Sequence, residues 1–212
     1  MTIYRFGDQS EKITLVQPID RMGIKSLERE LTQIRELTQT VFSLTAIAVD
    51  DWNRDLSPWS APPIFGKEPF GDGARETLDY ILEACSDQSR SYILGGYSLA
   101  GLFCLWAACN TDRFSGIAAA SPSVWFPHFT EHLRENRLQT DAVYLSLGDA
   151  EAKAKNPTLA TVSDCIEDTY TIIKDQKIPC ILEWNPGNHF KDPDLRCAKA
   201  FAWILNNKEN DL

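Results

Sequence analysis

The segment GGYSLAG, residues 95–101, places a serine in the kind of turn that exposes a nucleophile. A serine on a sharp turn from a strand into a helix needs small residues two positions to either side, because the two backbones nearly touch there. Gly96 and Ala100 hold these positions, although the usual pattern G-x-S-x-G has a second glycine. The segment predicts Ser98 as a nucleophile; the alternative is an ordinary turn in which Ser98 caps the following helix.

The segment NPGNHF, residues 185–190, contains the candidate base. A serine hydroxyl is a poor nucleophile until a base takes its proton, and imidazole titrates nearest to neutral pH. His189 is one of three histidines, and it lies between the last expected strand, 178–184, and the last expected helix. We therefore predict His189 as the base; the alternative is a histidine in a surface turn.

Two acidic residues follow the expected strand 142–147 and are candidates for the third member of a triad. A carboxylate beside the imidazole can hold it in one tautomer and stabilise the imidazolium ion. Asp149 and Glu151 both qualify by position. A chain with a net charge of −9 also carries many acids that only face solvent, which is the alternative for each of them.

Backbone amides that hold an oxyanion are expected at two places. One is the residue after the nucleophile, Leu99, and the other lies in the loop after the long early strand, at Asp51 or Trp52. In the same loop, Arg54 is a candidate for binding an anionic substrate. The alternative for Arg54 is a structural ion pair with Asp51 or Asp55.

The sequence HFTEH, residues 128–132, offers a competing chemistry. It matches the pattern H-x-x-E-H, in which two histidines one helical turn apart share a metal ion. A catalytic metal would need a third ligand on another element, and no residue stands out for that role. Solvent-exposed helix positions are therefore the favoured interpretation of His128 and His132.

Apolar periodicity predicts strands that alternate with helices. Strands are expected at 3–6, 13–17, 41–49, 91–94, 117–120, 142–147 and 178–184. Helices are expected at 24–34, 74–85, 99–109, 156–173 and 195–205. This alternation predicts one α/β domain over residues 1–212, with a mostly parallel central sheet flanked by helices on both faces. The candidate residues then follow the carboxyl ends of strands, where sites form in such sheets.

Composition limits the partners and the compartment. The 212 residues are 43% hydrophobic and carry 21 basic and 30 acidic side chains without a basic run, so nucleic acid is not an expected partner. No signal-peptide core and no apolar run of about 18 residues occurs, so we expect no membrane partner. Six cysteines without a C-x-x-C motif are typical of a reducing compartment, and we expect a cytoplasmic protein. Nothing in the sequence indicates an oligomeric state.

The chain resembles the esterase branch of the α/β-hydrolases, which includes enterochelin esterases, feruloyl esterases and S-formylglutathione hydrolases. The resemblance extends over residues 41–205. It rests on GGYSLAG, ASPSVWF (120–126), SLGDAE (146–151) and GNHF (187–190). It implies an α/β-hydrolase fold, and a chain of this length leaves little room for a large lid. The proline-rich segment 57–73 is expected to form one wall of the pocket.

The resemblance also implies roles for individual residues. Ser98 is then the nucleophile and His189 the general base. In feruloyl-esterase-like relatives the acid is the last residue of G-x-x-D after this strand, and residues 148–151 match with glutamate at that place, which favours Glu151 over Asp149. Some enterochelin-esterase relatives work with a serine–histidine dyad alone.

The segment ASPSVWF borders the site in this family, so Trp125 is expected to line the acyl or alcohol pocket. Trp52 and Trp59 are further candidates for this role. Ordinary core packing is the alternative for each tryptophan.

These observations predict a serine hydrolase that cleaves a carboxylic ester or thioester of a small molecule through an acyl-enzyme on Ser98, without a cofactor. Three alternatives stay open: an acyltransferase on the same fold, a metal-dependent hydrolase that uses His128 and His132, and a non-catalytic binding module.

Overall fold

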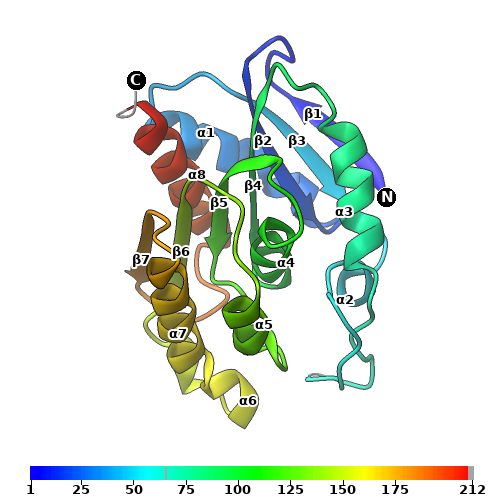
Figure 1. Ribbon diagram of the computed structural model, residues 1–212, viewed down its shortest axis with the longest axis vertical. Helices are drawn as coiled ribbons and strands as arrows, with labels where there is room; N and C mark the ends of the chain where they lie inside the picture. Colours follow the sequence, from blue (N-terminus) through cyan, green and yellow to red (C-terminus); the bar gives the residue numbers. More distant parts are fainter. Residues whose placement is uncertain (65, 210–212) are drawn as a thin grey trace.

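In the computed structural model, which describes residues 1–64 and 66–209, a seven-stranded sheet has the order β1-β3-β2-β4-β5-β6-β7 (Figure 1). β1 pairs antiparallel with β3, and every other neighbouring pair is parallel. The strands are β1 (Thr2–Phe6), β2 (Ile13–Ile19), β3 (Ser43–Ala48), β4 (Ser91–Tyr97), β5 (Phe114–Ala120), β6 (Val143–Gly148) and β7 (Cys180–Asn185).

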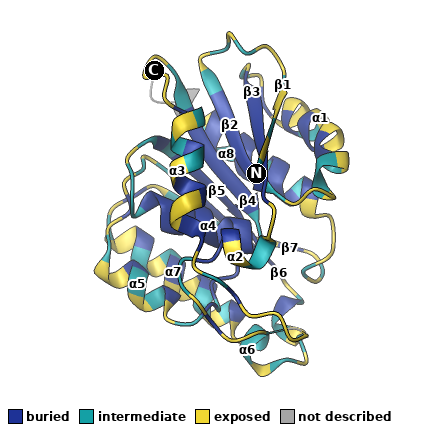
Figure 2. Cartoon of the chain, turned by 90° about the vertical axis from the view of Figure 1, so that its right-hand side faces the viewer, coloured by how far each residue is buried: buried dark blue, intermediate teal, exposed yellow. Residues whose placement is uncertain are grey.

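Helices cover both faces of this sheet (Figures 1 and 2). One face packs against α1 (Leu27–Leu37) and α8 (Pro193–Glu209). The other face packs against α3 (Ala74–Ala84), α4 (Leu99–Ala108) and α7 (Val162–Asp175). The shorter helices are η1 (Gly23–Ser26), α2 (Trp52–Asp55), α5 (Phe129–Glu135), η2 (Glu151–Lys153) and α6 (Pro157–Ala160).

Neighbouring residues of the central strands enter different cores. Leu15 and Ile93 belong to the core beneath α1 and α8, whereas Val16 and Leu94 belong to the core on the opposite face. Successive side chains of a strand point to opposite faces, so a strand that is covered twice is apolar at consecutive positions. The predicted mostly parallel sheet between two layers of helices is therefore confirmed.

The helix that follows Ser98 is buried on all sides. Every residue of α4 is buried, and the helix packs against β4 and β5. The absence of a polar face in this segment predicts such burial. The helix therefore gives the turn before it a rigid support.

The element boundaries differ from the predicted ones at two informative places. The strand predicted to end at residue 94 continues to Tyr97, because Gly95 and Gly96 keep pairing with Ala118 and Ala119 of β5. The predicted helix over 156–173 is divided into α6 and α7 at Thr161. The first difference brings the strand directly up to Ser98.

One residue on the buried face of α1 is a glutamate. Glu30 is 3% exposed, and its carboxyl group accepts one hydrogen bond, from Gln17 Nε2 at 3.3 Å. Burial raises the pKa of Glu30 to about 8, because the charged form loses its solvation and the nearby Asp194 adds repulsion. The single neutral donor lowers this pKa too little to compensate.

The cysteines are all free thiols, and none of the helices in the described residues is long and apolar enough to cross a membrane. Cys85, Cys104 and Cys197 are buried. Burial raises the pKa of Cys85 to about 12, so this thiol behaves as a small apolar group.

Candidate active site

Ser98 lies on a strained turn between β4 and α4. Its backbone has φ 58° and ψ −120°, a left-handed conformation that a side chain rarely adopts. A Cβ atom on Gly96 would lie 2.7 Å from the Cβ of Ala100, so only glycine fits at position 96. The methyl group of Ala100, the departure from the usual pattern, is accommodated because Gly96 has no side chain.

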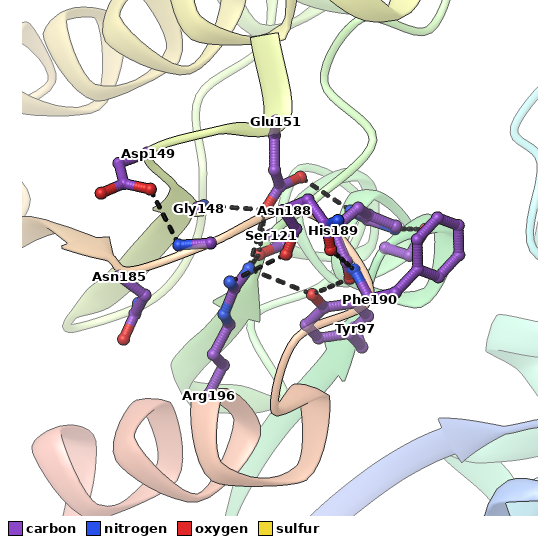
Figure 3. A network of polar contacts seen from close by, with 12 residues as sticks. Tyr97, Ser121, Gly148, Asp149, Glu151, Asn185, Asn188, His189, Phe190 and Arg196 are labelled. Atoms are coloured by element: carbon purple, nitrogen blue, oxygen red, sulfur yellow. Dashed lines mark hydrogen bonds and ion pairs between the residues drawn. The ribbon is translucent and has the colours of Figure 1, made fainter. Parts of the chain in front are cut away.

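His189 lies beside Glu151 (Figure 3) and also contacts Ser98. The Ser98 Oγ lies 3.0 Å from His189 Nε2, and His189 Nδ1 lies 2.7 Å from Glu151 Oε2. With the proton on Nδ1, the imidazole donates to the carboxylate and accepts from the serine hydroxyl. The three side chains come from the segments after β4, β6 and β7, and the structure places them in one line of hydrogen bonds.

The other oxygen of the Glu151 carboxylate is also fully used. Glu151 Oε1 accepts hydrogen bonds from the Gly148 amide at 2.7 Å, from Ser121 Oγ at 2.9 Å and from Arg196 Nη1 at 2.8 Å. Burial opposes the charge, but the bonds from His189, Gly148 and Ser121 and the attraction of His189 outweigh it and hold the pKa of Glu151 below its usual range. The group is therefore a carboxylate at neutral pH.

Arg196 joins this carboxylate to the histidine loop. The side chain is 2% exposed and projects from α8. Besides Glu151, it donates to the carbonyl oxygens of Asn188 at 3.0 Å and Pro186 at 3.3 Å. Figure 3 shows the guanidinium between Glu151 and the loop that carries His189. A single buried cation thus positions both Glu151 and the loop that carries His189.

Tyr97 and Asp149 hold the histidine loop from two further sides. The Tyr97 hydroxyl donates to the His189 carbonyl at 2.6 Å, and burial raises the pKa of Tyr97 to about 12, so the phenol keeps its proton. Asp149 Oδ1 accepts from the Gly187 amide at 2.8 Å. Asp149 therefore contacts the loop backbone, whereas Glu151 contacts the imidazole.

Ser123 is a second hydroxyl beside the nucleophile. Its Oγ lies 3.3 Å from Ser98 Oγ, and its amide donates to the Ser98 carbonyl at 3.0 Å. Ser121, two residues earlier, has a φ of 42°. The loop after β5 therefore supports both the nucleophile and the acid.

Of the two candidate oxyanion donors in the loop after β3, the amides of Asp51 and Trp52, one is already hydrogen-bonded within the loop. The amides of Asp50 and Asp51 donate to Asp55 Oδ2 at 3.0 and 2.9 Å, so the Asp51 amide is already engaged. Leu99 and Trp52 each begin a helix, where an N–H group has no carbonyl partner within the helix. Their amides stay the predicted donors.

Arg54 forms a structural ion pair with Asp55, which was the alternative to substrate binding. Its guanidinium lies 2.6 Å from Asp55 Oδ1, and Arg54 is not among the residues that line the cavity at Ser98. The tie to the buried Asp55 holds the guanidinium within its own loop. The structure therefore gives no support to substrate binding by Arg54.

A cavity of about 750 Å³ opens at Ser98. Its lining includes Trp125, Ser123, His189 and Phe190. Trp52 and Trp59 are not part of this lining: both pack against the core, and the Trp59 indole donates to the Pro127 carbonyl at 3.0 Å. Of the three candidate tryptophans, only Trp125 faces the cavity. None of the described residues of segment 57–73 lines it, so the expectation that this segment forms one wall of the pocket is wrong.

The two histidines of the HFTEH segment lie in different surroundings. His128 precedes α5 in a left-handed conformation with φ 65°, and His132 lies within the helix against the rings of Trp59 and Phe129. Burial lowers the pKa of His132. Across residues 1–64 and 66–209, no group of three or more His, Cys, Asp or Glu side chains is arranged to hold a metal ion.

Four polar residues of the site had not been singled out as site residues from the sequence: Tyr97, Ser121, Ser123 and Arg196. Arg196 carried a signal, because it is a charged residue inside the expected apolar helix 195–205. The two serines lie in the ASPSVWF segment, where nothing distinguishes a structural hydroxyl from a solvent-exposed one. Their roles depend on contacts with residues far away in the chain.

Comparison with solved structures identifies the fold. An IroE-like serine hydrolase from Shewanella oneidensis matches with a TM-score of 0.73 and 17% identity over 92% of this chain and 70% of that one. Siderophore hydrolase EstA from Aspergillus nidulans matches with a TM-score of 0.70 and 19% identity over 94% of this chain and 84% of that one. The enterobactin esterase FES from Shigella flexneri matches with a TM-score of 0.64 and 14% identity over 99% of this chain and 56% of that one. The chain has the α/β-hydrolase fold.

The predicted fold is confirmed by the comparison with solved structures and not by the comparisons of sequence. No protein-family model matches the chain, and a search of curated proteins finds no match either. In α/β-hydrolases the nucleophile lies on a sharp turn from a strand into a helix, and the catalytic residues follow in the order serine, acid, histidine. Ser98 lies on such a turn, and Ser98, Glu151 and His189 have that order along this chain.

Proposed function

We propose that this α/β-hydrolase is a serine esterase that cleaves carboxylic esters or thioesters through an acyl-enzyme on Ser98. The observation that carries the proposal is the line of hydrogen bonds from Ser98 Oγ to His189 Nε2, at 3.0 Å, and from His189 Nδ1 to Glu151, at 2.7 Å. The names of the structural neighbours, among them a serine hydrolase, a siderophore hydrolase and an enterobactin esterase, support the same class of reaction.

In the acylation step, His189 Nε2 takes the proton of Ser98 Oγ while the oxygen forms a bond to the carbonyl carbon of the ester. The carbonyl oxygen becomes an oxyanion, which the amides of Leu99 and Trp52 stabilise by hydrogen bonds. The intermediate then collapses, the bond to the leaving oxygen or sulfur breaks, and the imidazolium returns its proton to the leaving group.

In the deacylation step, water replaces the leaving group. His189 takes a proton from the water, the hydroxide oxygen bonds to the acyl carbon, and the acid product leaves as Ser98 regains its proton. Glu151 stays ionised throughout and stabilises the imidazolium ion. Its lowered pKa and its saturated second oxygen are suited to this role.

The proposal is tested by labelling with a fluorophosphonate and by hydrolysis of 4-nitrophenyl butyrate. The variant S98A should lose the label and lower kcat by a factor of about 10⁴ or more, because the nucleophile is absent. S89A, which changes an exposed serine in a turn, is the matched control and should keep both properties. Turnover that survives in S98A, or that is abolished by a chelator, would exclude serine chemistry.

A further inference from the structure

The cavity in front of Ser98 is lined by apolar side chains and by two exposed lysines, Lys153 and Lys155, which we call the rim. Trp125, Leu159 and Val162 supply the apolar lining. Lys153 and Lys155 are both exposed and both line the same cavity. A ligand that fills the space therefore meets both apolar side chains and two ammonium groups.

The charge of the rim is opposite to that of the chain. The protein has a net charge of −9, but the only acidic side chain in the lining is Glu151, whose two oxygens are taken by His189, Gly148, Ser121 and Arg196. In the part of the chain that the structure describes, neither lysine forms an ion pair or a side-chain hydrogen bond. Two uncompensated cations therefore face the space that a substrate enters.

The wall that carries the lysines is attached to the catalytic acid. Lys153 ends η2, which begins at Glu151, and the Ala154 amide donates to the Glu151 carbonyl at 3.1 Å. Asn156 then caps α6 and donates from Nδ2 to the Ile64 carbonyl at 3.3 Å. Because both ends of residues 151–156 are held, the backbone that carries the two lysines is fixed beside the cavity.

We propose that this cavity selects esters that carry an anionic group, with the apolar body against Trp125, Leu159 and Val162 and the anion at Lys153 and Lys155. The inference rests on the proposed esterase function and names its class of substrate. A rim of this kind also attracts anions before contact, because uncompensated charges at the mouth of a cavity raise the local concentration of the opposite charge.

The first test compares esters that differ only in charge. 4-Nitrophenyl hydrogen adipate carries a carboxylate on the acyl side, and its methyl ester is the neutral match; 4-acetoxybenzoate and its methyl ester form the corresponding pair on the alcohol side. In at least one pair, kcat/KM should be about tenfold higher for the anion, the effect of two partly screened ion pairs. The preference should fall as salt is raised from about 0.02 to 0.5 M.

The second test removes the rim. In K153Q/K155Q the ratio of kcat/KM for the anionic over the neutral ester should fall to near one. K12Q/K177Q is the matched control, with the same change of net charge at two exposed lysines that lie before β2 and β7 and do not line the cavity. This control should keep the ratio. A ratio near one in both pairs of esters, or a preference that survives in K153Q/K155Q, would overturn the inference.

A binding measurement separates this inference from the esterase proposal. In S98A, fluorescence of the tryptophans is titrated with each anionic ester and with its neutral match. Tighter binding of an anion that is lost in S98A/K153Q/K155Q supports the rim whether or not the wild type turns the ester over. Equal binding of anion and neutral ester overturns the rim, and hydrolysis of both at equal rates would leave the esterase proposal intact.

Discussion

Two glutamates of this protein are buried to nearly the same degree and are in opposite states. Glu30, on the buried face of α1, is 3% exposed, and Glu151, beside His189, is 6% exposed. The pKa of Glu30 is raised to about 8 by burial, whereas the pKa of Glu151 is held below its usual range. The difference lies in the donors: one neutral amide for Glu30, and a guanidinium, an amide, a hydroxyl and an imidazole for Glu151.

The comparison shows that burial by itself removes a charge and that surrounding donors are what retain it. The two groups also act on stability in opposite directions. The Glu151 carboxylate stabilises the fold above its unfolded pKa, and that contribution is lost as pH falls through the lower folded pKa. Glu30 instead favours folding while it holds its proton, and its contribution declines as pH rises towards 8.

The largest effect is expected when the catalytic carboxylate loses its charge. E151Q should lower kcat by about 10²- to 10⁴-fold, because an amide cannot stabilise the imidazolium ion and can favour the wrong tautomer. D149N, two residues earlier, is the matched control, and its loss should stay within several-fold, since the Asp149 carboxylate accepts from the Gly187 amide whereas Glu151 contacts the imidazole. Steady-state hydrolysis of 4-nitrophenyl butyrate measures both. Equal mild losses would indicate a serine–histidine dyad, and a larger loss in D149N would assign the acid to Asp149.

A smaller but more informative effect is expected at the cation. R196M removes the guanidinium that lies 2.8 Å from Glu151, so the pKa of the carboxyl group should rise and the acid limb of the kcat/KM profile should move to higher pH. Removing one partner of a buried ion pair also lowers the free energy of unfolding by about 3–5 kcal/mol.

Because R196M can fail to fold, R196K is measured beside it. R196K keeps the charge and should restore the acid limb, although it loses contacts with the histidine loop and should have a lower kcat. If R196M folds and its acid limb coincides with that of the wild type, Arg196 is structural only and the contrast between the two glutamates rests on the other donors.

The smallest effect on activity is expected at the other glutamate. Between pH 4.5 and about 8 the folded protein holds a proton on Glu30 that the unfolded chain has released, so the free energy of unfolding should fall with pH over this range. E30Q removes the titration and should gain stability relative to wild type at pH 8.5 but not at pH ~4.5. Urea unfolding at the two pH values measures this difference, and kcat/KM should be unchanged. A constant difference between the two proteins would show that Glu30 is ionised in the fold.

Much of this architecture could be predicted because each element carries its own pattern. The alternation of strands with helices indicated a sheet covered on both faces, and α4, which lacks a polar side, indicated a buried helix. The strand–turn–helix context around Ser98 indicated a nucleophile because the local crowding admits only small neighbours. The preference for Glu151 over Asp149 came from the resemblance to feruloyl-esterase-like relatives, and the structure places Glu151 at the imidazole.

Other features depended on residues that are distant in sequence. Arg54 pairs with Asp55 rather than lining the cavity, and Trp52 and Trp59 pack into the core, because only the packed loops decide which way these side chains face. Ser121 and Arg196 meet at Glu151 from positions 75 residues apart. No local pattern encodes that meeting.

By itself, the sequence determined the order of strands and helices, the turn that presents Ser98 and the loops that hold a base and an acid, because periodicity and small-residue spacing act over a few neighbouring residues. Only the tertiary structure decided which acid faces His189, which donors keep it charged and which lysines face the cavity. The protonation state of an acid and the accessibility of a lysine depend on the groups within a few ångströms of it. Those groups come from distant parts of the chain, and only the fold brings them together.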